Sequence, residues 1–205
     1  MYVANMRLLA GVFGLVLAFG AVARGETWNI DDSHSQANLK IKHLMISTVH
    51  GKITGIKGTV DYDGKDVTKA SVMATLDPAT IDTGNAKRDE HLRSADFLDV
   101  AKFKTMTFKS TGIEKAGDGF KLKGAFTMHG VTKSVTLNAD AISPEIKDPW
   151  GNFRHGISAS TKISRKDFGL AWNKALESGG VVVGDELDIT IEMEIMKAGA
   201  AKASK

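Results

Sequence analysis

The chain has 205 residues, 25% of them charged, and its formal net charge at pH 7 is +3. So small an excess of positive charge does not indicate a nucleic-acid-binding protein, and we expect no nucleic-acid partner. There is no cysteine, which excludes disulfides, thiol catalysis and a lipoprotein anchor. A chain of this length suits one domain that is stabilised by a buried core.

The N-terminus has the features of a secretory signal. Arg7 supplies a positive charge, and an uncharged apolar stretch follows from Leu8 to Phe19. Ala21-Val22-Ala23 fits the small-x-small pattern of a cleavage site, so we expect residues 1–23 to be removed and the mature protein to be periplasmic or secreted. The apolar stretch is too short to span a bilayer, which disfavours the alternative of a retained anchor. We therefore expect no stable membrane insertion after cleavage.

Most of the remaining chain alternates apolar and polar residues, the pattern of β-strands with one buried face. Segments with this pattern are 37–43, 72–76, 120–128, 135–141, 155–163 and, most clearly, 186–196. Turn-forming pairs such as Asp63-Gly64 and His129-Gly130 separate them. Short strands joined by tight turns predict an antiparallel meander.

Between Thr48 and Tyr62 the apolar alternation changes phase, which we interpret as a bulge near Gly55. A glycine at such a bend helps a sheet to curve into a barrel, and closure removes exposed strand edges. We therefore predict an all-β barrel over residues 24–197. An open sandwich is the alternative, because one sequence does not show which strands pair. Residues 198–205 are expected to form a flexible tail.

One charged stretch interrupts the β pattern. Asn85 to Asp99 lacks β-branched residues and predicts a short helix. His91 and Leu92 lie three and four residues after Arg88, so the three share one helical face. That face either holds a polar head group at the end of an apolar cavity or simply covers one end of the barrel.

No local signature of a hydrolase is present. Gly156 to Ser160 lacks the final glycine of a nucleophile elbow and lies within a predicted strand. Asp31, Ser33 and His34 are neighbours in sequence, whereas the members of a catalytic triad normally come from different elements. A turn in which the side chains of Asp31 and Ser33 accept backbone hydrogen bonds is the simpler interpretation.

The histidines do not form a recognisable metal motif, since no HExxH pair occurs. His43 and His155 share the parity of buried apolar residues. Each is therefore a hydrogen-bonded core histidine, a ligand contact or a metal ligand, and we favour the first. No metal site is expected.

A series of motifs matches one protein family in order. The most specific is the stretch Arg88-Asp89-Glu90-His91-Leu92-Arg93-Ser94-Ala95-Asp96-Phe97. The others are Trp28 to Asp31, Ser33 to Ser35, Phe108 to Ser110, His129 to Lys133, Arg165 to Leu170 and Val183 to Asp185. With these motifs the chain resembles the YceI family of periplasmic polyisoprenoid-binding proteins over essentially its whole mature length.

This resemblance implies an antiparallel, lipocalin-like barrel of about eight strands with one short helix and an elongated apolar interior. It implies no enzymatic reaction and no cofactor. We therefore expect a non-enzymatic protein that binds, stores or transports a polyisoprenoid or fatty-acid-like amphiphile. A homodimer of this chain is compatible with that role. An enzyme or redox accessory acting on an isoprenoid lipid is the alternative hypothesis.

The resemblance and the strand parity together suggest which side chains contact such a lipid. The polar head is assigned to Arg88, His91 and His43. The apolar tail is assigned to Leu39, Ile41, Leu92, Phe97, Phe108, Phe126, Ile157, Phe168 and Trp172. Each apolar side chain could equally be ordinary core, because a small barrel can be filled by its own side chains. No catalytic residue is assigned.

Overall fold

A computed structural model describes residues 25–177 and 179–199. The expected signal segment, residues 1–23, and residues 200–205 of the expected tail lie outside these described residues. Within the described ranges, no helix is long and apolar enough to cross a membrane.

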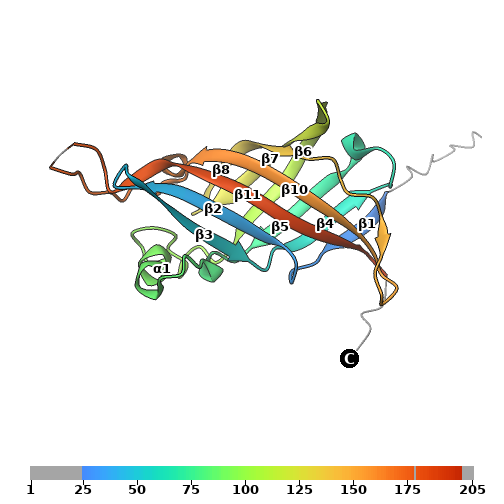
Figure 1. Ribbon diagram of the computed structural model, residues 1–205, viewed down its shortest axis with the longest axis horizontal. Coiled ribbons are helices and arrows are strands. Elements are labelled where there is room, and N and C mark those ends of the chain that lie inside the picture. The colour runs from blue at the N-terminus through green and yellow to red at the C-terminus, as the bar shows by residue number, and fades with distance from the viewer. Residues whose placement is uncertain (1–24, 178, 200–205) are drawn as a thin grey trace, which may run out of the picture.

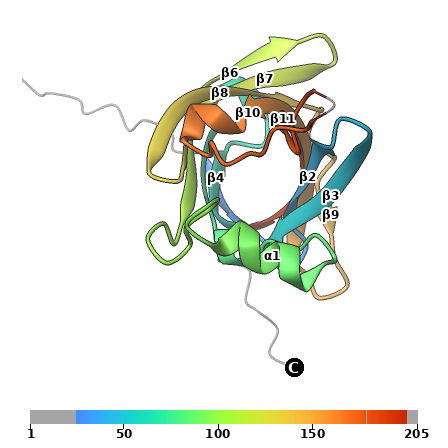
Figure 2. The same ribbon diagram turned by 90° about the vertical axis from the view of Figure 1, so that its left-hand side faces the viewer.

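Eight antiparallel strands close into a barrel, seen from the side in Figure 1 and from its left-hand end in Figure 2. Around the ring they are β11 (Val183–Lys197), β1 (Glu26–Ile30), β4 (Lys57–Tyr62), β5 (Ser71–Leu76), β6 (Met106–Ala116), β7 (Gly119–Met128), β8 (Val131–Ala139) and β10 (Phe153–Ser164). Pairing of β10 with β11 closes the ring. The predicted antiparallel barrel is confirmed, and the open sandwich is wrong.

Three further strands extend this ring. β2 (Gln36–His43) and β3 (Ser47–Thr54) form a hairpin, and β9 (Ile146–Lys147) pairs with β10. β1 and β2 pair with the same edge of β11, β1 near residue 195 and β2 along 183–192. The hairpin therefore lengthens the wall at one end of the barrel. The remaining elements are short helices: η1 (Val67–Lys69), η2 (Pro78–Thr80), α1 (Ala86–Arg93) and η3 (Arg165–Phe168).

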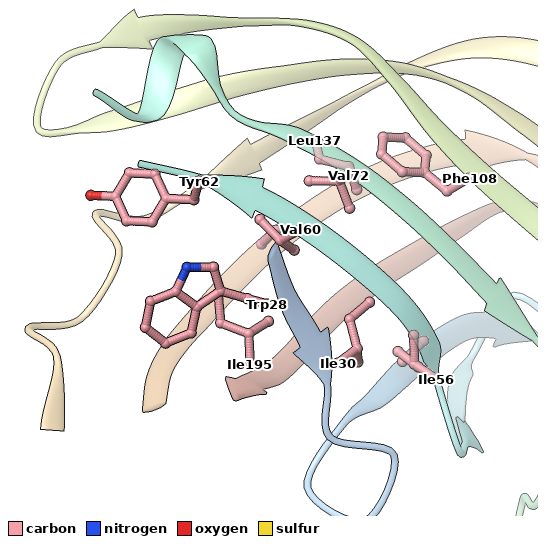
Figure 3. Close-up of a cluster of buried hydrophobic side chains, with 11 residues drawn as sticks. Trp28, Ile30, Ile56, Val60, Tyr62, Val72, Phe108, Leu137 and Ile195 are labelled. Carbon is pink, nitrogen blue, oxygen red and sulfur yellow. The ribbon is translucent and has the colours of Figure 1, made fainter. Parts of the chain in front are cut away.

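The buried core is concentrated in two clusters. One surrounds Trp28 and Ile195, which are both fully buried, and Figure 3 shows Tyr62 and Val60 beside them. The other surrounds Phe168 and lies toward the α1 end. The Trp28 end of the barrel is therefore filled by its own side chains.

The phase change near Gly55 is a complete break between two strands, so the predicted bulge within one strand is wrong. β3 ends at Thr54 and β4 begins at Lys57, and Gly55 between them has φ +71°. The two strands also have different partners, since β3 pairs with β2 whereas β4 pairs with β1 and β5.

The sequence pattern missed strands β1 and β6. In β6 the alternation is interrupted where the register shifts between Ser110 and Gly112, which hides the strand from a search for a period of two. The helix is shorter than predicted, since α1 ends at Arg93. The backbone of Ser94 is extended and Asp99 has φ +43°, so the chain turns back after two helical turns.

We predict that Gly58→Ala lowers the free energy of unfolding by about 3 kcal/mol or more. Gly58 has φ +144° and pairs with Ala74, and a Cβ here would overlap the backbone carbonyl oxygen of Met73. Urea denaturation measures the loss. Gly64→Ala is the matched control, because Gly64 also has a positive φ but open space around it, and about 1 kcal/mol is expected there. Equal losses would contradict the steric explanation.

Candidate functional site

A cavity of about 370 Å³ lies inside the barrel. Its wall consists of inward-facing side chains from β2, β3, β5, β6, β7, β8, β10 and β11 together with the segment that contains α1. The volume falls in the range typical of small-molecule sites. The barrel is thus filled at the Trp28 end and hollow beyond it.

The wall is almost entirely apolar, and its polar groups gather at one end. Lys42 and His43 come from the end of β2, Arg88 and His91 from α1, and Arg165 from η3. We call this end, formed by α1, the turn between β2 and β3, and residues 170–182, the mouth. Among the described residues, no aspartate or glutamate lines the cavity. The charged groups at its wall are therefore all cationic.

Arg88 is held at the mouth by a chain of hydrogen bonds. Its Nε donates to Thr83 Oγ1 at 2.7 Å, and its Nη2 donates to the Thr83 carbonyl oxygen at 2.9 Å. Thr83 in turn donates to the buried carboxylate of Asp89 from its backbone nitrogen, at 3.0 Å, and from its hydroxyl. Asn85 caps the helix by accepting from the Arg88 backbone nitrogen. The guanidinium is therefore fixed in place before any ligand arrives.

Three aromatic rings join α1 to the opposite side of the mouth. The His91 ring lies edge-on to Phe97 and to Trp172, with both centroid distances 5.0 Å, and Phe97 and Trp172 are 5.1 Å apart. His91 Nε2 also lies 2.9 Å from Asp96 Oδ2. This arrangement makes an amphipathic rim, since three aromatic rings line the cavity and one of them, His91, carries polar ring nitrogens.

Arg165 has a structural role despite lining the cavity. Its guanidinium donates to the carbonyl oxygens of Leu170, Trp172 and Gly184. Burial lowers the pKa of Arg165, and the nearby Asp185 opposes that effect; the side chain remains charged, because arginine loses its proton only far above neutral pH. Its donors are used in tying the Trp172 segment to the start of β11.

All but one of the predicted ligand-contacting residues line the cavity. They are Leu39, Ile41, His43, Arg88, His91, Leu92, Phe97, Phe108, Phe126, Ile157 and Trp172. Whether these side chains contact a ligand stays a prediction. Ala37 faces the cavity as well.

Phe168 is the exception, so its assignment to the lining was wrong. It is 1% exposed and packs edge-on against Phe126, with the centroids 5.5 Å apart. It lies on η3, where strand parity no longer determines which way a side chain points. Phe168 therefore supports the wall from behind.

His43 and His155, which alternate in phase with buried apolar residues, have different roles. His155 does not line the cavity; its Nδ1 lies 2.7 Å from the Ser143 carbonyl oxygen, and its ring packs 4.6 Å from Trp28. The interpretation as a hydrogen-bonded core histidine is confirmed there. His43 lies at the mouth.

The sequence analysis missed two features of the site. Thr83 and Asp89 position Arg88, but nothing in their spacing distinguishes them from ordinary turn and helix residues. The volume itself depends on small side chains that different strands contribute to the wall. These are Ala37, Ala74, Ala139 and Ala159.

A second polar cluster surrounds Arg154 near the Trp28 end. Its guanidinium lies 2.5 Å from Asp31, 2.8 Å from Asp148 and 3.0 Å from Glu194. The oxygens of Asp31 and Glu194, with a nitrogen of His34, are close enough together to hold a metal ion. Arg154 already supplies the positive charge that a metal would bring.

Asp31 confirms its own part of the predicted turn, since its Oδ1 accepts from the Ser33 backbone nitrogen at 3.0 Å; the acceptor role predicted for the Ser33 side chain stays a prediction. Burial would raise the pKa of Asp31, but hydrogen bonds from Arg154, His34 and Ser33 outweigh it and hold the pKa well below its usual range. Asp148 behaves in the same way, with Arg154 and Asn152 as its donors. The cluster is an ion-pair network that joins β1, β10 and β11.

Comparison with known proteins gives consistent matches over the folded part of the chain. A family model described as a YceI-like domain matches residues 28–195. A UPF0312 protein from Serratia proteamaculans is 39% identical over 181 residues, which cover 87% of this chain and 92% of that protein. A UPF0312 protein from Shewanella sp. (strain MR-7) is 36% identical over 189 residues, or 91% and 96% of the two chains.

Solved structures with the same fold include the YceI protein of Campylobacter jejuni, at 30% identity and a TM-score of 0.63, covering 76% of this chain and 89% of that one. BcnA from Burkholderia cenocepacia has a TM-score of 0.69 at 19% identity, with 80% and 98% covered. A polyisoprenoid-binding domain from Saccharophagus degradans has a TM-score of 0.58 at 13% identity, with 83% and 98% covered.

We predict that Ala74→Leu changes the free energy of unfolding by less than about 1 kcal/mol, because the added carbons enter empty space. Gly124→Ala is the contrasting variant, since a Cβ there would overlap the Phe108 ring; we expect it to cost about 1–3 kcal/mol. Urea denaturation of both variants gives the comparison. A large loss for Ala74→Leu would mean that the interior is packed and the cavity is not available.

We predict that acid destabilises the protein through the Arg154 cluster. The pKa values of Asp31 and Asp148 are lowered in the folded state. Their contribution to the free energy of unfolding is therefore complete above the aspartate pKa of the unfolded chain, about 4, and is lost as the pH falls below that pKa. Arg154→Met should lower stability at pH 7 and reduce the further loss between pH 7 and pH 3. Lys115→Met, an exposed site, is the control for removing a cation. Parallel pH profiles for all three proteins would refute this explanation.

Proposed function

The chain belongs to the YceI family, and from this premise we propose that it binds one long-chain amphiphilic lipid of the polyisoprenoid type inside its barrel. The protein stores or carries this lipid without changing it chemically. The fold that it shares with a polyisoprenoid-binding domain from S. degradans supports the proposal.

The distribution of polarity along the cavity is the observation that carries this proposal. An apolar wall that ends in cationic groups matches a molecule with an apolar tail and a polar head. Burying the tail is favourable by roughly 25 cal/mol per Å² of apolar surface, so a long chain needs a lined cavity more than it needs specific contacts. We infer that the tail lies toward the Trp28 end and the head at the mouth.

The head group would meet Arg88, His91 and His43. Arg88 is the strongest candidate because its hydrogen bonds to Thr83 fix its orientation, so little side-chain entropy is lost on binding. His91 and His43 offer ring nitrogens that can donate or accept. A head with oxygen acceptors suits this set.

A binding role suits the site better than catalysis. General acid–base chemistry commonly pairs carboxylates or combines a carboxylate with a histidine. His91 has such a partner in Asp96, but Asp96 does not line the cavity, and no other carboxylate of the described residues does. The enzyme or redox accessory remains the alternative hypothesis. It would require turnover of a bound lipid that is lost on replacing His43 or His91 without loss of folding.

We further propose a periplasmic or secreted location for the mature protein, on the strength of the charge, apolar stretch and Ala-x-Ala sequence of residues 1–23. A water-insoluble lipid needs a container wherever it crosses an aqueous space. A homodimer stays a prediction.

The test is to identify the bound lipid and then to block its site. Protein purified without detergent is extracted and analysed by mass spectrometry, and affinity is measured by displacement of a fluorescent fatty-acid probe. We expect Ala159→Trp to weaken binding at least tenfold by filling the cavity. Arg88→Met should weaken binding by roughly tenfold, as expected for loss of one charged hydrogen bond.

Lys121→Met on the outer face of β7 is the matched control and should bind as the wild type does. Circular dichroism confirms that each variant is folded. A protein that carries no lipid and does not bind isoprenoid quinones, fatty acids or fatty amides would overturn the proposal.

A further inference from the structure

A carrier of a water-insoluble lipid must exchange that lipid with a membrane. We propose that the β2–β3 hairpin docks the mouth of the barrel onto the surface of an anionic lipid bilayer. This inference rests on the proposed function, because it concerns how the same cavity is loaded and emptied. It describes reversible contact with the head-group layer rather than insertion.

The tip of the hairpin presents apolar side chains to solvent. Leu44, Met45 and Ile46 connect the two strands, and Ile46 is 83% exposed while Met45 is 56% exposed. Leu44 has φ +52° and Met45 has φ +64°, a backbone conformation that is unfavourable for such residues. Strained backbone that persists at a surface is often associated with function. Here it holds two large apolar side chains away from the core.

The charge of the hairpin complements an anionic surface. Residues 36–54 contain three lysines, Lys40, Lys42 and Lys52, with two histidines and no aspartate or glutamate. Among the described residues, none of these lysines forms an ion pair, whereas several lysines elsewhere in the barrel do. Lys42 comes just before the tip and Lys40 lies two residues earlier on β2, whereas Lys52 lies opposite Asn38, further from the tip. Exposed apolar side chains beside unpaired cations favour binding to the interface of anionic membranes.

The tip lies directly at the mouth. Lys42 and His43, just before it, line the cavity. The Leu44 backbone nitrogen donates to the Val182 carbonyl oxygen at 2.8 Å, so the turn is tied to the other side of the mouth. Figure 1 shows the turn between β2 and β3 at the left-hand end of the barrel, the end that α1 also covers. A bilayer in contact with the tip would therefore meet the mouth, and a lipid could pass between them without crossing bulk water.

A second apolar patch lies at the opposite end and suits this role less well. Trp150 is 65% exposed and Ile146 is 59% exposed. Neither residue lines the cavity, and the carboxylates of Asp148 and Glu194 at this end are already paired with Arg154. Contact there would leave the mouth facing away from the membrane. This patch supplies the matched control.

The experiment measures sedimentation of the protein with lipid vesicles. The full-length chain is expressed and its mass determined, so that wild type and variants are compared with the same N-terminus. Vesicles are made either of equal parts phosphatidylglycerol and phosphatidylcholine or of phosphatidylcholine alone. The tip variant is Met45→Asn with Ile46→Ser, because asparagine tolerates the backbone conformation of residue 45. The charge variant replaces Lys40, Lys42 and Lys52 with glutamine.

We expect wild type to bind the anionic vesicles and the tip variant to bind them at least fivefold less. The charge variant should lose binding to anionic vesicles, and high salt should have the same effect on wild type. Trp150→Ser should bind as wild type does. The rate at which a fluorescent fatty acid moves from protein to vesicle should fall with vesicle binding in the tip variant, while its equilibrium affinity for the protein stays unchanged.

Equal vesicle binding by wild type and the tip variant would overturn the docking proposal, as would a loss confined to Trp150→Ser. The proposal would also be overturned if wild type did not bind anionic vesicles, or if its hairpin bound only a protein partner. Failure of the proposed function looks different. In that case no protein binds the fatty-acid probe, whatever the vesicles show.

Discussion

The pairing of β10 with β11 is the constraint on which the rest of the structure depends. It runs from Arg154 opposite Met196 to Ser164 opposite Glu186 and turns a curved sheet into a closed barrel. Because the closed wall has no unpaired strand edge, the apolar cavity is not exposed to water between two strands. The other edge of β11 carries β1 and β2 in succession, so one strand both closes the ring and supports the hairpin at the mouth.

Three arginines show how one residue type serves different ends of the barrel. Arg154 lies among three carboxylates and stabilises the filled end. Arg165 donates to several carbonyl oxygens and to the Asp185 carboxylate, and it fixes the backbone beside the mouth. Arg88 is oriented only by Thr83 among the described residues, which leaves part of its guanidinium available. Stability and binding are therefore separated along the barrel axis.

Closure into a barrel was predicted from the phase change near Gly55, which is a break between two strands rather than a bulge, and from the family resemblance. The alternation of apolar residues was enough to predict antiparallel strands, because long strands such as β11 keep a strict period of two. It failed where the register shifts in β6 and at the break near Gly55, since pairing partners determine those features. Helical spacing brought Arg88, His91 and Leu92 to the cavity as predicted. Phe168 was misplaced because strand parity does not continue through η3. The cavity itself depends on alanines from separate strands, and no single segment of sequence reveals their combined effect.

The three tryptophans of the chain sit in three different surroundings, and the protein thereby carries its own optical probes. Trp28 is enclosed in the filled end, Trp150 projects into water, and Trp172 forms part of the aromatic rim with His91 and Phe97. Indole emission depends on the polarity around the ring. Occupancy of the mouth should therefore change mainly the emission of Trp172, and loss of the packed core mainly that of Trp28, without any added label.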